Sequence, residues 1–286
     1  MKNLFKLMLL AVVVLFACAK EKMTDESVVA NPLKTSTTVT TESALKAAVK
    51  AAKAGDVITI SGTIKLTSIL QLLNSGTSSS KINLTGGTLD CSGISSGWGV
   101  KCNGSYWNIT NITIKNSPDC GIVFQSGGYN YIYKVTTTGN KDSGMQIYNS
   151  SHDNNVSYCT STNNYDTQNL GENADGFACK LSGGKNNKFS NCTSTGNSDD
   201  GWDLYGQPNS VTITSCTASS NGKGTNGDGN GFKLGSSGQS VPHTVTYCTS
   251  NSNRASGYDG NGNTGHITTT GSGGSGNGKA LWYRIY

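Results

Sequence analysis

Four aspartates and one lysine stand beside glycines that recur along the chain. The acidic residues and the lysine are Asp175, Asp199, Asp200, Asp203 and Lys233. Clustered carboxylates repel one another unless a cation is present, and oxygen-only ligands select calcium over softer metals. A lysine whose pKa is lowered by a nearby divalent cation can act as a base. If the glycines stack in space, these residues form a calcium site beside a base.

A repeated turn is the simpler explanation of Asp-Gly pairs, because an aspartate often bonds to its own backbone there. Other repeats, however, place Cys120, Ser143 and Ser256 before the same glycine. The acids concentrate on two successive repeats, and the next repeat brings Lys233. This concentration favours a functional site. A lysine that only forms a surface salt bridge is the alternative interpretation of Lys233.

The positions of these residues depend on a repeat in which a glycine precedes an apolar–x–apolar triplet. The glycines are Gly99, Gly121, Gly144, Gly176, Gly201, Gly231 and Gly257. A second anchor follows each of the first six glycines, at Ile112, Val135, Cys159, Cys192, Cys216 and Cys248. Units of about 22 to 25 residues with alternating strands and almost no helical pattern predict an all-β fold. The architecture expected is a parallel β-helix, a solenoid in which each unit forms one coil.

Alternation along each triplet assigns its two faces. The first and third positions are apolar in nearly every repeat and are predicted to point inward. The middle position and the residue before the glycine then point outward, and they hold Asp175, Asp200, Asp203 and Lys233. Asp199 lies in the turn and must reach in through a bend of the backbone. We therefore predict a surface cluster of acids on neighbouring coils.

Two further features concern the edges of this solenoid. Insertions at residues 163–174 and 222–229 lie on the edge that carries the acids, where long loops commonly wall a binding groove. Near the N-terminus, Leu45, Val49 and their neighbours follow helical spacing, with Thr40 or Thr41 as the N-cap. We expect this amphipathic α-helix to cap the open N-terminal end of the solenoid.

The first residues predict an exported precursor. Lys2 and Lys6 precede an apolar run that is too short to span a membrane, and the run ends in Leu-Phe-Ala-Cys18, which resembles a bacterial lipobox. We expect residues 1–17 to be a lipoprotein signal peptide, Cys18 to carry lipid, 18–36 to be a tether and 37–286 to form the β-helix domain. The protein would be an exported lipoprotein of the outer membrane or cell surface, with secretion behind an ordinary signal peptide as the alternative.

Composition narrows the class of ligand. Without Lys2 and Lys6, 20 basic residues stand against 17 acidic ones, a net charge of +3 that weakly favours an acidic ligand and is far from a nucleic-acid-binding balance. Nine cysteines in an exported chain suggest disulfides. Four of them, however, occupy anchor positions that hold Ile112 and Val135 in earlier coils. We expect these four to be buried free thiols.

A cation beside a lysine favours proton abstraction over hydrolysis. Calcium would keep the carboxylates ionised, whereas an inverting glycosidase needs one protonated carboxyl group. On a uronic acid polymer, calcium bound to the C6 carboxylate would acidify the C5 proton, and a neutral Lys233 would remove it. Departure of the O4 substituent would leave an unsaturated uronide.

Four segments of the chain resemble the pectate lyases of polysaccharide lyase family 9. They are 173–178 (NADGFA), 199–205 (DDGWDLY), 229–235 (GNGFKLG) and 253–259 (NRASGYD). The resemblance runs from about residue 40 to 262 and is most specific in 199–205. It implies a right-handed parallel β-helix that depends on calcium and cleaves polygalacturonate by β-elimination with a lysine base.

The same resemblance assigns roles to single residues. It implies calcium ligands at Asp175, Asp199, Asp200 and Asp203, with Lys233 as the base and Arg254 as a partner for a substrate carboxylate. The partner would be an acidic polysaccharide, polygalacturonate or pectin. The chain would be a monomer that binds no nucleic acid and meets a membrane only through its lipid anchor. The alternatives are a pectin-type glycoside hydrolase on the same fold and a non-catalytic, calcium-stabilised glycan-binding or adhesive solenoid.

The repeat pattern changes near the C-terminus. After about residue 263 the anchors give way to a Gly/Ser stretch that ends in Lys279-Ala-Leu-Trp-Tyr283. We expect an irregular end from about this point and hypothesise that the C-terminus is truncated or frame-shifted. Such an end would leave the last coil poorly covered.

Overall fold

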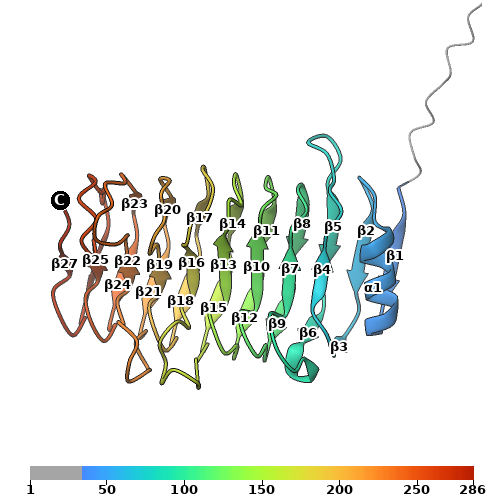
Figure 1. Ribbon diagram of the computed structural model, residues 1–286, viewed down its shortest axis with the longest axis horizontal. Coiled ribbons are helices and arrows are strands. Elements are labelled where there is room, and N and C mark those ends of the chain that lie inside the picture. The colour runs from blue at the N-terminus through green and yellow to red at the C-terminus, as the bar shows by residue number, and fades with distance from the viewer. Residues whose placement is uncertain (1–33) are drawn as a thin grey trace, which may run out of the picture. The chain divides into compact units, whose positions relative to one another are not determined.

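The fold is a solenoid of three parallel β-sheets with nine strands each (Figure 1). The computed structural model describes residues 34–286. The predicted signal peptide, most of the predicted tether and Cys18 lie outside the described residues. Among the described residues, no helix has the length and apolarity required to cross a membrane. The predicted right-handed parallel β-helix with an N-terminal helix is confirmed.

From β2 to β25, successive strands pass from sheet A to sheet B to sheet C and then back to sheet A in the next coil. Sheet A contains β1 (Ser36–Val39), β2 (Val57–Ile60), β5 (Ile82–Thr85), β8 (Trp107–Thr110), β11 (Tyr131–Tyr133), β14 (Asn155–Ser157), β17 (Lys188–Ser190), β20 (Thr212–Thr214) and β23 (Thr244–Thr246). Sheet B contains β3 (Thr63–Lys65), β6 (Thr88–Asp90), β9 (Thr113–Lys115), β12 (Thr136–Thr138), β15 (Thr160–Thr162), β18 (Thr193–Thr195), β21 (Thr217–Ser219), β24 (Thr249–Asn251) and β26 (Gly273–Ser275). Sheet C contains β4 (Leu70–Leu72), β7 (Val100–Cys102), β10 (Ile122–Gln125), β13 (Met145–Tyr148), β16 (Phe177–Cys179), β19 (Trp202–Asp203), β22 (Phe232–Lys233), β25 (Tyr258–Asp259) and β27 (Trp282–Tyr283).

The N-terminal end is covered as the sequence predicts. Helix α1 (Glu42–Ala51) begins after Thr41, whose hydroxyl accepts a hydrogen bond from the backbone N–H of Ala44. Leu45 and Val49 on one face of α1 are buried in the core. A short 3-10 helix (Cys91–Gly93) follows β6. Since α1 packs across the first coil, the apolar interior of the solenoid is not open to solvent at this end.

Sheet C is the sheet whose strands follow the repeated glycines. The first triplet position points inward, and its aromatic side chains stack along the solenoid axis. The ring centroids of Phe177 and Trp202 lie 4.9 Å apart, and those of Trp202 and Phe232 lie 4.8 Å apart. A Cβ on Gly176 would lie 2.0 Å from the hydroxyl oxygen of Ser194. Only glycine fits at this position, which explains why a glycine recurs in each repeat.

The cysteines confirm the second anchor position of the repeat. Within residues 34–286 all eight cysteines are free and buried. Cys159, Cys192, Cys216 and Cys248 stand directly before strands of sheet B, in the positions that hold Ile112 and Val135 in earlier coils. They act there as small apolar groups.

A ladder of buried asparagines closes the turn between sheets B and C. The Asn164 side chain donates from Nδ2 to Oδ1 of Asn197 at 2.8 Å, and Asn197 donates in turn to Asn221 at 2.9 Å. The same oxygens also accept the backbone N–H of the preceding asparagine. Asn140, Asn253 and Asn277 extend the ladder on both sides. Each rung satisfies buried polar groups that water cannot reach, so the ladder sets the register of the coils.

The C-terminal end differs from our expectation of an irregular segment after about residue 263. Strand β26 pairs with β24, and β27 pairs with β25. The Trp282 ring stacks on Tyr258 with a centroid distance of 4.3 Å. The Gly/Ser stretch therefore forms another coil. Its backbone pairs like the others, although glycine supplies no inward side chain in β26 that a hydrophobic pattern could reveal.

The asparagine ladder leads to a stability prediction. Replacing Asn197 by alanine removes the acceptor for the Asn164 amide and backbone N–H, and each buried group left unsatisfied costs about 1–3 kcal/mol. We expect the melting temperature to fall by roughly 5–10 °C, measured by circular dichroism. Asn155→Ala, at an exposed position on β14, is the matched control and should change it by less than about 2 °C. Equal losses in both variants would contradict the role of the ladder.

Candidate active site

The four predicted calcium ligands and Lys233 meet at the outer face of sheet C and in the turns that lead into it. Strand register places Asp203 of β19 beside Ala178 of β16 on one side and Lys233 of β22 on the other. Asp175 and Asp200 occupy the same turn in neighbouring coils, and the backbone N–H of Asp200 donates to Oδ1 of Asp175 at 3.2 Å. The stacking of coils thus brings together residues that are up to 58 positions apart in the sequence.

Three of the carboxylates are close enough to share one ion. Asp175, Asp199 and Asp200 each offer an oxygen, and these oxygens lie within 4.8 Å of one another. Asp199 reaches the group from the turn, as the sequence required. Its Oδ2 accepts from the backbone N–H of Asn173 at 3.1 Å. Three of the four predicted ligands therefore lie around a single point, and Asp203 is not among them.

The cluster is buried, which corrects the prediction of a surface cluster. Asp175 and Asp200 have no exposed surface, and Asp203 is 3% exposed. Alternation along the strands correctly predicted the outward direction of Asp203 and Lys233, which line a groove. The segments 163–174 and 222–229, whose loops extend further than their neighbours in Figure 1, contact Asp199 through the backbone N–H groups of Asn173 and Asp228. Periodicity carries no information about where such loops run.

Burial and the neighbouring lysines shift the pKa values of these aspartates in opposite directions. Burial raises the pKa of Asp175, Asp199 and Asp200 above the ordinary value for an aspartate, and mutual repulsion adds to it. Burial acts the same way on Asp203, but Lys180 and Lys233 outweigh it and lower the pKa of Asp203. Full ionisation of the four carboxyl groups would therefore need more positive charge than Lys180 and Lys233 supply.

One oxygen in this cluster is left without a hydrogen bond. Oδ2 of Asp200 is buried and has no hydrogen-bond partner among the described residues, although Nζ of Lys233 lies 3.5 Å away. A buried carboxylate oxygen without a partner is costly. Together with the oxygens of Asp175 and Asp199, it offers the hard, anionic donors that calcium accepts. The residues present therefore fit a hard divalent cation.

Lys233 lies at the edge of the cluster, as predicted. Its Nζ is 2.7 Å from the carboxylate of Asp228 and 3.9 Å from that of Asp203. The ammonium group also lies over the ring of Tyr205, 5.6 Å from the centroid. Burial would lower the pKa of Lys233, but the charges of Asp203 and Asp200 outweigh burial and raise it. Asp228 comes from the 222–229 insertion, so this loop supplies a residue to the site.

Sequence analysis missed Lys180. Its Nζ lies 2.8 Å from Oδ2 of Asp175 and 3.0 Å from Oδ2 of Asp203. Burial would lower the pKa of Lys180, but Asp175 and Asp203 hold it well above its usual range. Lys180 directly follows β16, where the alternation of the strand no longer predicts a direction. Its position four residues after Gly176, on the coil that carries Asp175, was the available signal.

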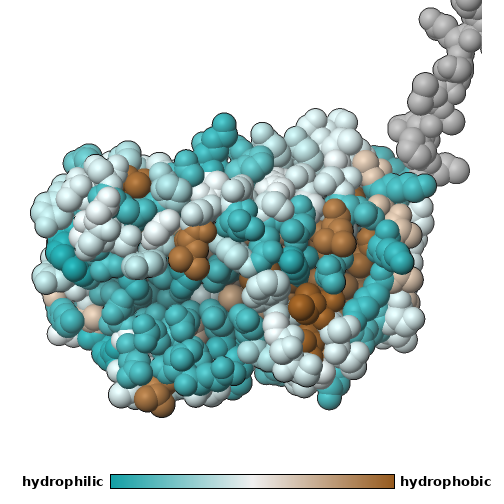
Figure 2. All heavy atoms as spheres, in the orientation of Figure 1, coloured by the Kyte–Doolittle hydropathy of each residue, from teal (hydrophilic) through white to brown (hydrophobic). Residues whose placement is uncertain are grey.

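A groove of about 560 Å³ opens over these residues. Figure 2 shows mainly hydrophilic side chains on the face over β16, β19 and β22. The groove is lined by Asp142, Gln146, Glu172, Asn173, Lys180, Leu181, Asp199, Asp203, Tyr205, Asp228, Lys233 and Asn261. Of the four predicted ligands, only Asp199 and Asp203 reach this lining, because Asp175 and Asp200 lie deeper.

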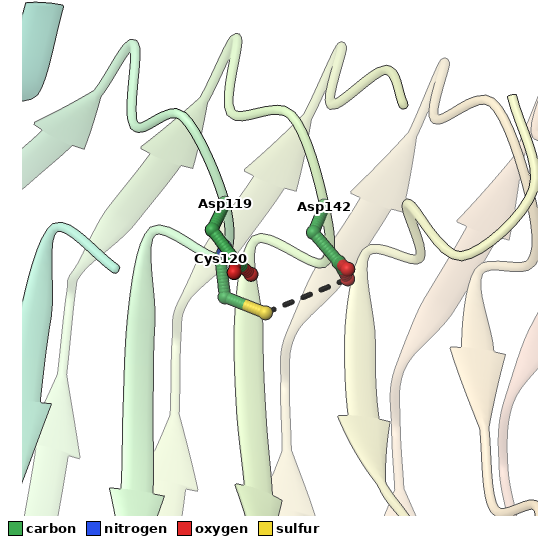
Figure 3. A group of neighbouring side chains, drawn as sticks. All are labelled: Asp119, Cys120 and Asp142. Atoms are coloured by element: carbon green, nitrogen blue, oxygen red, sulfur yellow. Dashed lines mark hydrogen bonds between the residues drawn. The ribbon is translucent and has the colours of Figure 1, made fainter. Parts of the chain in front are cut away.

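A second acidic group lies at one end of the groove (Figure 3). The thiol of Cys120 donates to Oδ1 of Asp142 at 3.5 Å, and Asp119 stands beside them. Burial raises the pKa of the Cys120 thiol and of the Asp142 carboxyl group. A protonated thiol is a poor metal ligand. This group is therefore a weaker candidate for a cation than the Asp175 cluster.

Arg254 does not join the cluster. Its guanidinium Nη1 donates to the backbone oxygens of Gly224 and Thr225, the latter at 3.2 Å. These contacts hold the 222–229 insertion against the solenoid. Arg254 is absent from the groove lining among the described residues. Its position supports a role in placing the loop that carries Asp228.

Comparisons with known proteins agree with this fold. The family model "Pel9A-like, right handed beta helix region" matches residues 27–285. Pectate lyase L of Paenibacillus polymyxa (strain SC2) is 38% identical over 192 residues, which cover 60% of this chain and 42% of that protein. Pectate lyase L of Dickeya chrysanthemi is 31% identical over 185 residues, which cover 63% of this chain and 43% of that protein.

A solved structure agrees with these relatives. The crystal structure of pectate lyase Pel9A aligns with a TM-score of 0.73 and 28% identity, covering 78% of this chain and 61% of that chain. The chain spans about two fifths of the length of the two curated relatives. Since the family model spans nearly the whole described solenoid, this chain belongs to the Pel9A-like right-handed β-helix family.

Proposed function

We propose that this chain is a calcium-dependent pectate lyase that cleaves polygalacturonate by β-elimination, with Lys233 as the base. The observation that carries the proposal is the contact of a lysine amine with a buried carboxylate cluster at the floor of a groove. The similarity to proteins named pectate lyase supports the substrate class. An acidic polysaccharide also suits the positive net charge of the chain.

In this proposal Asp175, Asp199, Asp200 and Asp203 hold the calcium ion. When bound, calcium would withdraw electron density from the uronate carboxylate and acidify the proton on C5. The fit of the site rests on the oxygens within 4.8 Å of one another and on the unpartnered Oδ2 of Asp200. Because Asp199 and Asp203 reach the groove, a substrate carboxylate can approach the cluster from their side.

Lys233 then takes the C5 proton. The electron pair of the C5–H bond forms the C4=C5 double bond, and the C4–O4 bond breaks with the pair leaving on O4. Lys233 must be a neutral amine for this step. Its present partners, Asp228, Asp200 and Asp203, stabilise the ammonium form instead. The proposal therefore requires that a bound calcium ion compensate these carboxylates, so that they no longer stabilise the ammonium form of Lys233.

The alternative hydrolase needs a protonated acid and a base that both face the substrate. Asp175 and Asp200 have raised pKa values, but neither lines the groove. Asp142 and Asp199 have raised pKa values and do line it, so a hydrolase would use these acids. The lyase is preferred because the chain is similar to proteins named pectate lyase.

For the N-terminal segment we propose the exported lipoprotein of the outer membrane or cell surface that the sequence predicts, with residues 1–17 as signal peptide and Cys18 as the lipidated residue. Metabolic labelling with a fatty acid in a bacterial host tests it. Label should enter the native chain, and Cys18→Ala should abolish labelling. Label retained in Cys18→Ala would exclude the anchor.

Lys233 provides the main test of the reaction. With polygalacturonate and calcium, the full-length chain should generate ultraviolet absorbance from unsaturated products. Lys233→Ala should lower this rate by at least about 10²-fold, because a positioned base contributes that much. Lys188→Ala, an exposed lysine on β17, is the control and should keep the native rate. Reducing ends without absorbance would indicate a hydrolase, and polymer binding without either product would indicate the glycan-binding solenoid.

The titration of the cluster leads to a pH prediction for the metal-free protein. The pKa values of Asp175, Asp199 and Asp200 are raised in the folded state. The stability that these groups contribute to the fold is therefore present below about pH 4 and is lost as the pH rises through the raised pKa values. The lowered pKa of Asp203 acts in the opposite sense, but only below about pH 4.

In a calcium chelator we therefore expect the melting temperature to fall between pH 5 and pH 8. Calcium should reduce this slope, because it compensates the ionised carboxylates. Asp200→Asn should also reduce it in the chelator, since an amide does not ionise. A metal-free melting temperature that stays constant over this range would contradict the charge assignment.

A further inference from the structure

Lys180 is a second lysine in the site, and the proposed reaction does not use it. It is 8% exposed, and its Nζ lies between two coils. The ammonium contacts Oδ2 of Asp175 at 2.8 Å and Oδ2 of Asp203 at 3.0 Å. Both carboxylates are themselves at least nine-tenths buried. A long, flexible side chain held between two buried anions loses much conformational freedom, so the contact must offset that loss.

Each of the two carboxylates accepts hydrogen bonds at both of its oxygens. In Asp175, Oδ2 also accepts from the hydroxyl of Ser143, and Oδ1 accepts from the backbone N–H of Asp200. In Asp203, Oδ1 accepts from the backbone N–H of Tyr205 at 2.9 Å, while Oδ2 accepts from Lys180. Lys180 therefore sets the orientation of both acids from the same side.

The charges of the site show why such a cation is needed. Four aspartates of the cluster face two lysines, and the nearest partner of Lys233 is Asp228, whose side chain is 56% exposed. The contacts of Lys233 with Asp200 and Asp203 are longer, at 3.5 and 3.9 Å. Lys180 is thus the only lysine in the described site that makes its closest contacts with buried carboxylates. Without it, Asp175 and Asp203 would lose their closest cation, and a buried charge without a close partner is strongly destabilising.

We propose that Lys180 is a built-in counter-cation of the calcium site. It is a positioning residue that allows the carboxylate cluster to fold without metal and orients Asp175 and Asp203. Because Lys180 and calcium draw on the same two carboxylates, Lys180 also weakens calcium binding. The second effect rests on the proposed function, whereas the effect on the metal-free fold does not.

Thermal unfolding and calcium titration of the full-length chain test this role. Lys180→Met keeps the length of the side chain and removes its charge. In a calcium chelator we expect its melting temperature to be at least about 5 °C below that of the native chain. Calcium should raise the melting temperature more in this variant than in the native chain. Calorimetry should give a calcium dissociation constant at least about tenfold lower.

Two further variants separate charge from packing. Lys180→Arg retains the charge and should restore most of the metal-free melting temperature. Lys188→Met removes an exposed lysine on β17 and should change neither the metal-free melting temperature nor calcium affinity. The gain in calcium affinity is the decisive measurement, because a residue that only packs would weaken calcium binding when it is replaced.

An unchanged metal-free melting temperature, or weaker calcium binding, in Lys180→Met would overturn the proposal. If this variant is unfolded in the chelator, recovery of the fold with calcium supports the proposal. If it is unfolded in both conditions, the double variant Lys180→Met/Asp203→Asn decides. It removes one negative charge together with the positive one and keeps the native net charge of the cluster, so recovery supports the proposal and persistent unfolding overturns it. If calcium does not change the melting temperature of the native chain, the proposed calcium site is excluded. The comparison in the chelator would still test the role of Lys180 in the metal-free fold.

Discussion

The in-register stacking of coils is the constraint on which the site depends. Each buried asparagine of the ladder satisfies the side chain and the backbone N–H of its neighbour, so a coil cannot slip without leaving both unpaired. A slip of one residue would also turn the outward positions of sheet C into the core. Asp203 and Lys233 are therefore adjacent because the turns that lead into sheet C are locked in register.

This rigidity lets the solenoid tolerate an unfavourable charge arrangement. Asp175, Asp199 and Asp200 are held close although burial and repulsion both oppose their ionisation. A flexible loop would relax by moving one carboxylate into solvent, whereas acids fixed by the pairing of strands and turns cannot. The clearest sign of this unfavourable arrangement is the buried Oδ2 of Asp200, which has no hydrogen-bond partner among the described residues. Such a preorganised set would bind a cation without a further ordering cost.

Much of this arrangement could be predicted from the sequence, because the repeat is local. The glycines and alternation placed the strands of sheet C and the outward direction of Asp203 and Lys233 correctly. The sequence did not reveal the burial of the cluster, which depends on the path of the 222–229 insertion through space. It also did not reveal Lys180, which lies past the end of its strand, or the coil with β26, whose glycines carry no apolar signal. Alternation describes a strand only as far as the strand extends.

The two lysines of the site show how partners decide what a residue can do. Lys180 has two buried carboxylates as partners, and neither can be exchanged without leaving a buried charge without a close partner. The closest partner of Lys233, Asp228, is exposed on a loop, so water or a substrate can replace it at little cost. A base must release one partner and accept a proton from another in every cycle. Of these two amines, only Lys233 can make that exchange while the cluster beneath it stays in place.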